Sequence, residues 1–192
     1  MKKTLFTPIG MSYLGVLIAL QIVLGNLVQV ALVEKQMNFG FLPIAAAGYL
    51  LGPLGGMIVA ALGDILGTLI FGTGAYFPGF TLTALIVGGL YGLALYPRYM
   101  RHLGNLISNT YARLAVRALL ASAMGAAVYV FLNSYWLTFL VPKGYTVLLL
   151  ARLPFNLAEI PVFTVLITLT CIILDRLPPT LIPATFRAES GK

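Results

Sequence analysis

Three polar residues share one face of the last apolar segment of the chain. Arg152, Asn156 and Glu159 are spaced i, i+4 and i+7, so one side of a helix carries all three. Ionisable groups inside a membrane span are costly and usually face a cavity or each other. The helix dipole favours cations at the C-terminal end of a helix, but Arg152 stands near the predicted start. The pattern favours an anion-binding site; the alternatives are an Arg-Asn-Glu network within the helix, or an Arg152 that reaches the outer surface.

Aromatic residues gather near the same end of the predicted spans. Tyrosine and tryptophan at such positions usually form a membrane-interface belt. Phenylalanine is less well explained by a belt, and the turn from Phe77 to Phe80 fixes the directions of two rings. We expect part of the group to stack on a ligand and part to anchor the protein in the bilayer. The group comprises Phe39, Phe41, Tyr76, Phe77, Phe80, Tyr135, Trp136 and Tyr145.

One carboxylate, Asp64, is the only charge between residues 36 and 97. It precedes Tyr76 by about twelve positions, which at about 1.5 Å per helical residue places it about 18 Å below the outer turn. That depth favours helix packing or the floor of a pocket over a contact at its mouth. Asp64 is therefore a weaker candidate site residue.

The remaining residue types exclude several chemistries. The chain has one cysteine, Cys171, and one histidine, His102, so a disulfide framework and the common multi-cysteine and two-histidine metal motifs are excluded. A Ser-His dyad would require His102 to leave a basic loop. The sequence contains no Gly-x-x-x-x-Gly-Lys-Ser/Thr segment, so ATP use would have to come from a partner. We expect neither an enzyme nor a cofactor, and no metal site.

The elements that must position these residues are membrane helices. The chain has 192 residues, of which 60% are hydrophobic and 9% charged, and its mean hydropathy is +0.98. The net charge of +7 comes from cations scattered between apolar runs, which argues against nucleic acid. Helices of about 20 residues cross a bilayer, and unpaired backbone is prohibitive there. We predict one all-α membrane domain over residues 1–192, with a compact bundle of six spans near 11–33, 41–52, 55–71, 79–96, 114–140 and 153–175.

Two signals define the ends of these spans. The turn residues Gly52-Pro53 and the 72–79 segment break the long apolar run. The first run follows Lys2 and Lys3, is longer than a signal-peptide core and lacks a small-x-small cleavage site, so we expect it to remain in the mature protein.

Most lysines and arginines fall on the side of the two termini, which the positive-inside rule places in the cytoplasm. The opposite side carries Lys35, Lys143 and Arg152.

The first predicted span carries a small-residue pair. Gly15 and Ala19 stand four positions apart on one helical face. Small residues at this spacing let a second helix approach closely, which matters in lipid because no hydrophobic driving force brings helices together there. The pair predicts a docking surface for a partner helix, and a contact within the chain is the alternative.

Several motifs, taken in order, resemble a known family. They are Phe-Leu-Pro-Ile, Leu-Gly-Pro, Gly-Asp-Ile-Leu-Gly, Tyr-Phe-Pro-Gly-Phe-Thr-Leu and Tyr-Gly within 39–96, with "LNSYWLTFL" and "ARLPFNLAEIPV" further on. Their combination resembles the folate family of substrate-binding S components of energy-coupling-factor (ECF) vitamin transporters. One departure is Phe155, which stands where the family commonly carries a lysine.

The resemblance implies an S component with both termini in the cytoplasm of a prokaryotic cell, in the plasma membrane. It would capture a vitamin outside, and would work with a transmembrane coupling protein and two ATP-binding-cassette ATPases. Transport would involve toppling of the S component in the membrane. The Gly15–Ala19 pair resembles the small-residue pair of the family's first helix.

A folate ligand has a flat pterin, an aminobenzoyl ring and a glutamate, and the chain offers groups for each part. Under this resemblance, Tyr76, Phe77, Phe80 and Trp136 would stack, and Asn156, Asp64 or Glu159 would read the pterin. Arg152, Lys35 or Lys143 would face the glutamate, with Tyr135 and Phe39 as further candidate contacts. Another flat anionic vitamin, a pterin-like compound or pantothenate would suit the same groups. A structural or channel-forming membrane protein is the more distant alternative.

Overall fold

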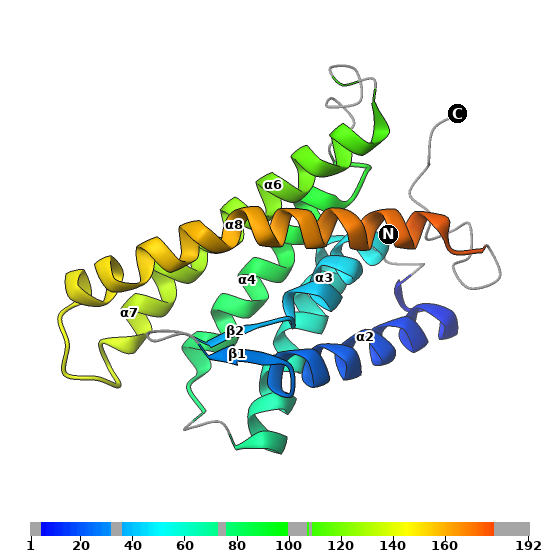
Figure 1. Ribbon diagram of the computed structural model, residues 1–192. Helices are drawn as coiled ribbons and strands as arrows, with labels where there is room; N and C mark the ends of the chain where they lie inside the picture. Colours follow the sequence, from blue (N-terminus) through cyan, green and yellow to red (C-terminus); the bar gives the residue numbers. More distant parts are fainter. Residues whose placement is uncertain (1–4, 32–35, 73–75, 100–106, 108, 179–192) are drawn as a thin grey trace.

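A computed structural model describes residues 5–31, 36–72, 76–99, 107 and 109–178. The described chain is helical except for one short hairpin (Figure 1). Its elements are α2 (Pro8–Asn26), β1 (Gln29–Ala31), β2 (Gln36–Asn38), α3 (Phe41–Phe71), α4 (Pro78–Leu95), α6 (Thr110–Val128), the π-helix η1 (Tyr129–Asn133), α7 (Ser134–Leu137) and α8 (Tyr145–Arg176).

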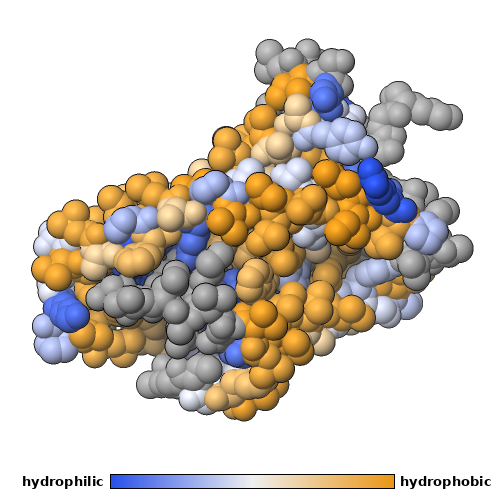
Figure 2. Space-filling view, viewed as in Figure 1, coloured by the Kyte–Doolittle hydropathy of each residue, from blue (hydrophilic) through white to orange (hydrophobic). Residues whose placement is uncertain are grey.

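Five helical stretches of the described chain are long and apolar enough to cross a membrane. They are Pro8–Asn26, Phe41–Phe71, Pro78–Leu95, Thr110–Leu137 and Tyr145–Arg176. Large apolar side chains stand exposed along them, among them Val16, Leu69 and Leu150. Figure 2 shows that apolar residues cover most of the described surface on the face in view. A surface of this kind is stable only in contact with hydrocarbon, so the chain is a multi-pass membrane protein.

The first helix is shorter than predicted. It ends at Asn26, and the residues expected to complete the span to residue 33 begin a hairpin instead. Strands β1 and β2 pair antiparallel, with Gln29 opposite Asn38. The apolar run gave no sign of this, because alternating valine and glutamine suits a strand as well as a helix. The hairpin brings Gly40 against the backbone of Gly25, where a Cβ on Gly40 would stand 3.1 Å from the Gly25 Cα.

The predicted break at Gly52-Pro53 is present, and it reverses the chain inside α3. Gly52 has φ 79° and ψ −168°, a conformation that glycine adopts and residues with a Cβ rarely do. A Cβ on Gly56 would stand 3.5 Å from the Gly48 Cα, so the segments on either side of the break lie against each other. In Figure 1, α3 runs to this point and doubles back. The chain has turned without any loop.

Helices α3 and α4 meet backbone to backbone. A Cβ added at Gly48 would stand 2.8 Å from the Gly92 nitrogen, and one at Gly56 would overlap the Gly88 carbonyl. These four residues, Gly48, Gly56, Gly88 and Gly92, form what we call the glycine seam. Close approach of this kind replaces the hydrophobic effect, which does not hold helices together in lipid. The seam fixes the position of α4, whose first turn carries part of the candidate site.

Helix α8 begins eight residues before the predicted start at residue 153. It runs from Tyr145 to Arg176 and contains Pro154 and Pro161. Proline lacks one backbone donor and usually ends a helix in water, but membrane helices tolerate it. The prediction placed Arg152 near the start of the helix. Arg152 in fact lies two turns inside the helix, so the argument from the helix dipole at its start does not hold.

Helix α8 is tied to the other helices by polar contacts and rings. The Ser122 and Thr164 hydroxyls lie 2.8 Å apart between α6 and α8. The Tyr49 hydroxyl donates to Asp175 Oδ1 at 2.7 Å, and Phe41 stacks on Phe163 with ring centroids 3.8 Å apart. These contacts hold the second half of α8 against α3 and α6 (Figure 1), and α8 also contacts α7 and η1.

Candidate functional site

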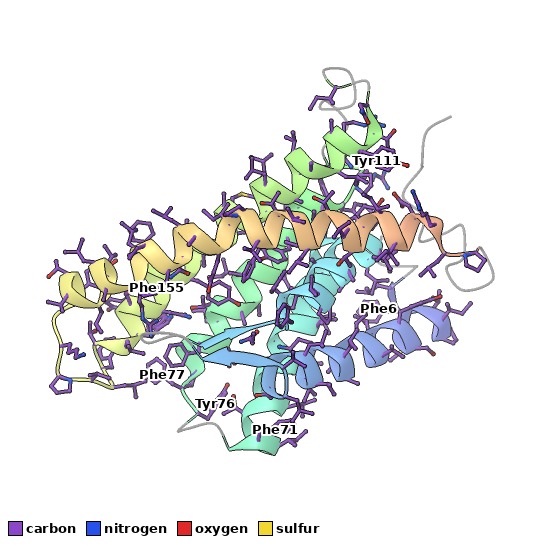
Figure 3. All side chains as sticks on the ribbon, viewed as in Figure 1. Phe6, Phe71, Tyr76, Phe77, Tyr111 and Phe155 are labelled. Atoms are coloured by element: carbon purple, nitrogen blue, oxygen red, sulfur yellow. The ribbon has the colours of Figure 1, made fainter. Side chains whose placement is uncertain are left out.

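An aromatic cluster joins the start of α4 to the end of the helical stretch Thr110–Leu137. Phe77 stands at its centre, with its ring centroid 5.7 Å from that of Phe80 and 5.9 Å from that of Trp136. Phe139 lies 6.4 Å from Phe77 and 5.4 Å from Tyr135, which in turn lies 5.1 Å from Trp136. Figure 3 shows Phe77 and Tyr76 where the chain enters α4. Three of the predicted stacking residues, Phe77, Phe80 and Trp136, therefore form one group with Tyr135, a further predicted contact.

The indole of Trp136 is held by α4. Its Nε1–H donates to Thr83 Oγ1 at 3.1 Å, and the Thr83 hydroxyl donates to the Gly79 carbonyl, also at 3.1 Å. Thr83 is fully buried. A Cβ at Gly79 would stand 2.5 Å from both Phe77 Cε1 and Trp136 Cδ2, so the two rings lie directly on the Gly79 backbone. The orientation of the indole is fixed before any ligand arrives.

Asp64 lies closer to Tyr76 and the start of α4 than predicted. The Thr81 hydroxyl, in the first turn of α4, donates to Asp64 Oδ2 at 2.6 Å and lies 3.2 Å from the Tyr76 hydroxyl. The depth estimate applied the rise of a helix to all of the roughly twelve positions from Asp64 to Tyr76, but α3 ends at Phe71, where the predicted span also ends, and Gly72 is left-handed. The carboxylate therefore belongs to a polar group beside the aromatic cluster, not to a distant floor.

The polar face of α8 points into the bundle. Asn156 is 4% exposed and Glu159 6% exposed, which excludes a lipid-facing position for both. The Asn156 amide donates to the Arg152 carbonyl at 2.9 Å, and Arg152 itself is half-buried. The Tyr129 phenol on η1 lies within range of the charges of both Asp64 and Glu159.

Other predicted residues lie outside this group. Phe39 stacks on Phe41, and Phe41 belongs to the core through its contact with Phe163. Lys143 is exposed in the turn before α8, and Lys35 falls outside the described residues. Tyr145 is exposed at the first position of α8, as an interfacial ring would be.

Three residues of the site were missed from the sequence. Thr81 and Thr83 connect Asp64 and Trp136 to α4, and Phe139 adds a ring to the aromatic cluster. The threonines follow the quoted Phe-Pro-Gly-Phe turn at a spacing of two. Threonine in a membrane helix usually bonds to its own backbone, so their types alone gave no signal of contacts to other helices.

The small-residue pair on α2 faces outward. A Cβ at Gly15 would meet no heavy atom within 4 Å, and Ala19 is exposed. The alternative of a contact within the described part of the chain is therefore excluded for Gly15. The surface around the pair is apolar, with Met11, Val16 and Leu20 exposed.

Fold and site together define a multi-pass helical membrane protein with rings and polar groups gathered around the start of α4. The family model for "ECF transporter, substrate-specific component" matches residues 11–171. The chain belongs to this family, which confirms the resemblance at family level. The family is a transporter component and not an enzyme.

Two curated relatives and one solved structure are similar to the chain. "Folate transporter FolT" of Clostridium novyi (strain NT) is 33% identical over 168 residues, which cover 87% of this chain and 90% of that protein. "Folate transporter FolT" of Leuconostoc mesenteroides subsp. mesenteroides is 38% identical over 89 residues, which cover 46% of this chain and 45% of that protein. A crystal structure of FolT bound with folic acid has 24% identity and a TM-score of 0.69, with 90% of this chain and 96% of that chain covered, and shows the same fold.

Proposed function

We propose that this chain is the folate-binding S component of an ECF importer. The observation that carries the proposal is the meeting of the Trp136 ring cluster with the polar group around Asp64 at the start of α4. A flat heteroaromatic ligand needs rings to stack on and hydrogen-bonding groups beside them. The relative of 33% identity, which is named as a folate transporter, supports folate as that ligand.

Each part of folate has candidate partners. Phe77, Phe80 and Trp136, with Tyr76 and Tyr135 at the edge, would stack on the pterin and aminobenzoyl rings. Asp64, Asn156 and Glu159 would pair with the amino and amide edge of the pterin. Phe39 packs on Phe41, apart from the cluster around Phe77, so it would contact the ligand only at its periphery. Arg152 would bind the glutamate, with Lys143 closer to the solvent. Nanomolar binding corresponds to about 12 kcal/mol, which several stacked rings and charge-assisted hydrogen bonds can supply.

The topology we propose has six passes, with the two halves of α3 counted separately. In Figure 1 the first turn of α2 and the last turn of α8 lie toward the right, whereas the connections after α2 and after α7 lie toward the left. An even number of passes accounts for this arrangement. Arg98, Arg113 and Arg176 belong to the side of the termini, which supports a cytoplasmic location for them. The ring cluster then faces the outside of a prokaryotic cell.

Transport requires partners that this chain does not contain. We assign to the exposed Gly15–Ala19 pair the docking of a transmembrane coupling protein, which two ATPases would drive. A partner helix can approach Gly15 closely because no other part of the described chain occupies the space beside it. The largely apolar exterior suits a protein that topples in lipid.

Purified protein in detergent tests the proposal directly. Trp136 is the chain's only tryptophan, so its fluorescence reports on the ring cluster alone. Titration with folate is expected to give a saturable change at nanomolar to micromolar concentration, and pantothenate is expected to give none. A saturable response to pantothenate with none to folate would show that the ligand is pantothenate and not folate. No response to any vitamin would overturn the binding function.

A further inference from the structure

Several serine and threonine hydroxyls on the membrane helices of this protein bond back to their own helix, whereas Thr81 bonds to Asp64 on α3. Ser12, Thr164, Thr168 and Thr170 each donate to the carbonyl four residues earlier, at 2.6 to 3.0 Å. Thr83 does the same toward Gly79. This is the usual arrangement for serine and threonine in an apolar environment, because it leaves no polar atom without a partner.

Ser134 departs from this pattern. It is fully buried, and its Oγ has no hydrogen-bond partner among the residues that the structure describes. The neighbouring residue, Asn133, shows the same departure: its Oδ1 is buried and has no partner in the described chain. Asn26 and Asn156, by contrast, each donate to the carbonyl four residues earlier. Buried polar atoms without partners are rare in proteins and call for a physical cause.

The cause is local backbone geometry. Asn133 is the last residue of the π-helix η1 and Ser134 is the first residue of α7. A π-helical turn holds one more residue than an α-helical turn, which changes the direction of the side chains that follow it. Turns of this kind are frequent at functional sites. Here the turn leaves two polar side chains unpaired inside the bundle.

The location of the two residues points to a ligand. Asn133 and Trp136 are three positions apart and lie on one side of the helix. At the other end of the π-helix stands Tyr129, within range of the charges of Asp64 and Glu159. The unpaired atoms thus belong to the same short segment of helix as the Trp136 ring.

We propose that Asn133 and Ser134 are ligand contacts that read the amide and amino edge of the stacked bicyclic ring. Asn133 Oδ1 accepts a hydrogen bond from a ring N–H or amino group, and the Ser134 hydroxyl donates to a ring carbonyl or nitrogen. This assignment rests on the proposed function, and it gives two partners for the pterin besides the carboxylates.

The test compares Ser134→Ala and Asn133→Leu with a matched control, Ser122→Ala. Ser122 is also buried, but its hydroxyl is paired with Thr164 and the Leu119 carbonyl. Calorimetric titration in detergent measures affinity for folate, for pterin-6-carboxylate and for p-aminobenzoylglutamate, which lacks the pterin. Thermal unfolding without ligand measures stability.

We expect Ser134→Ala to unfold at the same or a higher temperature, because it removes an unpaired polar atom. Its affinity for folate and for pterin-6-carboxylate is expected to fall about tenfold, a typical effect of losing one buried hydrogen bond. Affinity for p-aminobenzoylglutamate stays unchanged. Ser122→Ala should show the reverse pattern, with a lower unfolding temperature and wild-type affinity.

Two results would overturn the inference. One is wild-type folate affinity in Ser134→Ala. If Asn133→Leu does not fold, Ser134→Ala alone decides, because alanine fits wherever serine does. The other is an equal loss for p-aminobenzoylglutamate, which would show a general disturbance of the site. A wild-type protein that binds no folate overturns the proposed function as well, so the two failures are told apart by the wild-type titration.

Discussion

The Trp136 indole donates its only hydrogen bond to the buried Thr83 hydroxyl, across 3.1 Å between α7 and α4. Thr83 is thus a positioning residue: it holds the ring that we expect to stack on the ligand. A ring with a fixed orientation loses less freedom when a ligand binds, which raises affinity without any added contact.

Replacement of Thr83 by valine should therefore weaken folate binding about tenfold, since the buried indole N–H loses its partner. The emission maximum of Trp136 in the ligand-free protein should shift as well, and Thr83→Ser should restore both values. Thr164→Val serves as the control, because the Thr164 hydroxyl bonds to Ser122 and Ile160 and not to the indole. Unchanged emission and affinity in Thr83→Val would show that packing on Gly79 alone orients the ring.

Removal of the Arg152 guanidinium should weaken folate binding by more than about tenfold, because a hydrogen bond between charged groups contributes about 1.5–3 kcal/mol. The loss should be much smaller for pteroate, which lacks the glutamate. Arg176→Ala, at the opposite end of α8, is the matched control and should bind as wild type. Equal losses for folate and pteroate in Arg152→Ala would assign the arginine to another part of the ligand.

Leucine at Gly15 or Ala19 should abolish co-purification with the coupling protein while folate binding stays intact. The space beside Gly15 is empty within the described chain, so the added side chain disturbs a partner and not the fold. Ala127→Leu, at an exposed small residue on α6, is the control. Retention of the partner by both α2 variants would place its contacts on another surface.

Alanine at Gly56 should destabilise the protein by about 1–3 kcal/mol or more, because its Cβ would overlap the Gly88 carbonyl and both backbones are fixed. Alanine at Gly15 should instead leave stability unchanged or raise it by up to about 1 kcal/mol, from helix propensity alone. Thermal unfolding in detergent compares the two. Equal unfolding temperatures would mean that α3 and α4 can separate at no cost.

The sequence was sufficient for the class of fold, the family and the break at Gly52, because each depends on strong local signals. A run of apolar residues with one charge must be membrane-embedded, and its length requires reversals where glycine and proline allow them. Helix ends were predicted less well. Residues 27–33 satisfy a helix or a strand equally, and Pro154 ends helices in water but not in α8.

The candidate site was predictable in its residue types and not in its connections. The rings of Phe77, Phe80 and Trp136 follow from the Phe-Pro-Gly-Phe turn and the end of the fifth span. Their links to α4 through Thr81 and Thr83 depend on how the helices pack. The π-helix at Tyr129–Asn133 has no sequence signature at all, since its residues suit an ordinary α-helix equally well.

The glycine seam has a mechanical consequence. Where Gly48 and Gly56 meet Gly92 and Gly88, no side chain stands between the backbones, so there are no rotamers that could rearrange. The paired helices cannot slide or roll past each other without atomic overlap, and they move as one stiff unit. The seam therefore acts as a rigid element that keeps the first turn of α4, with Thr81 and Thr83, at a constant position relative to α3.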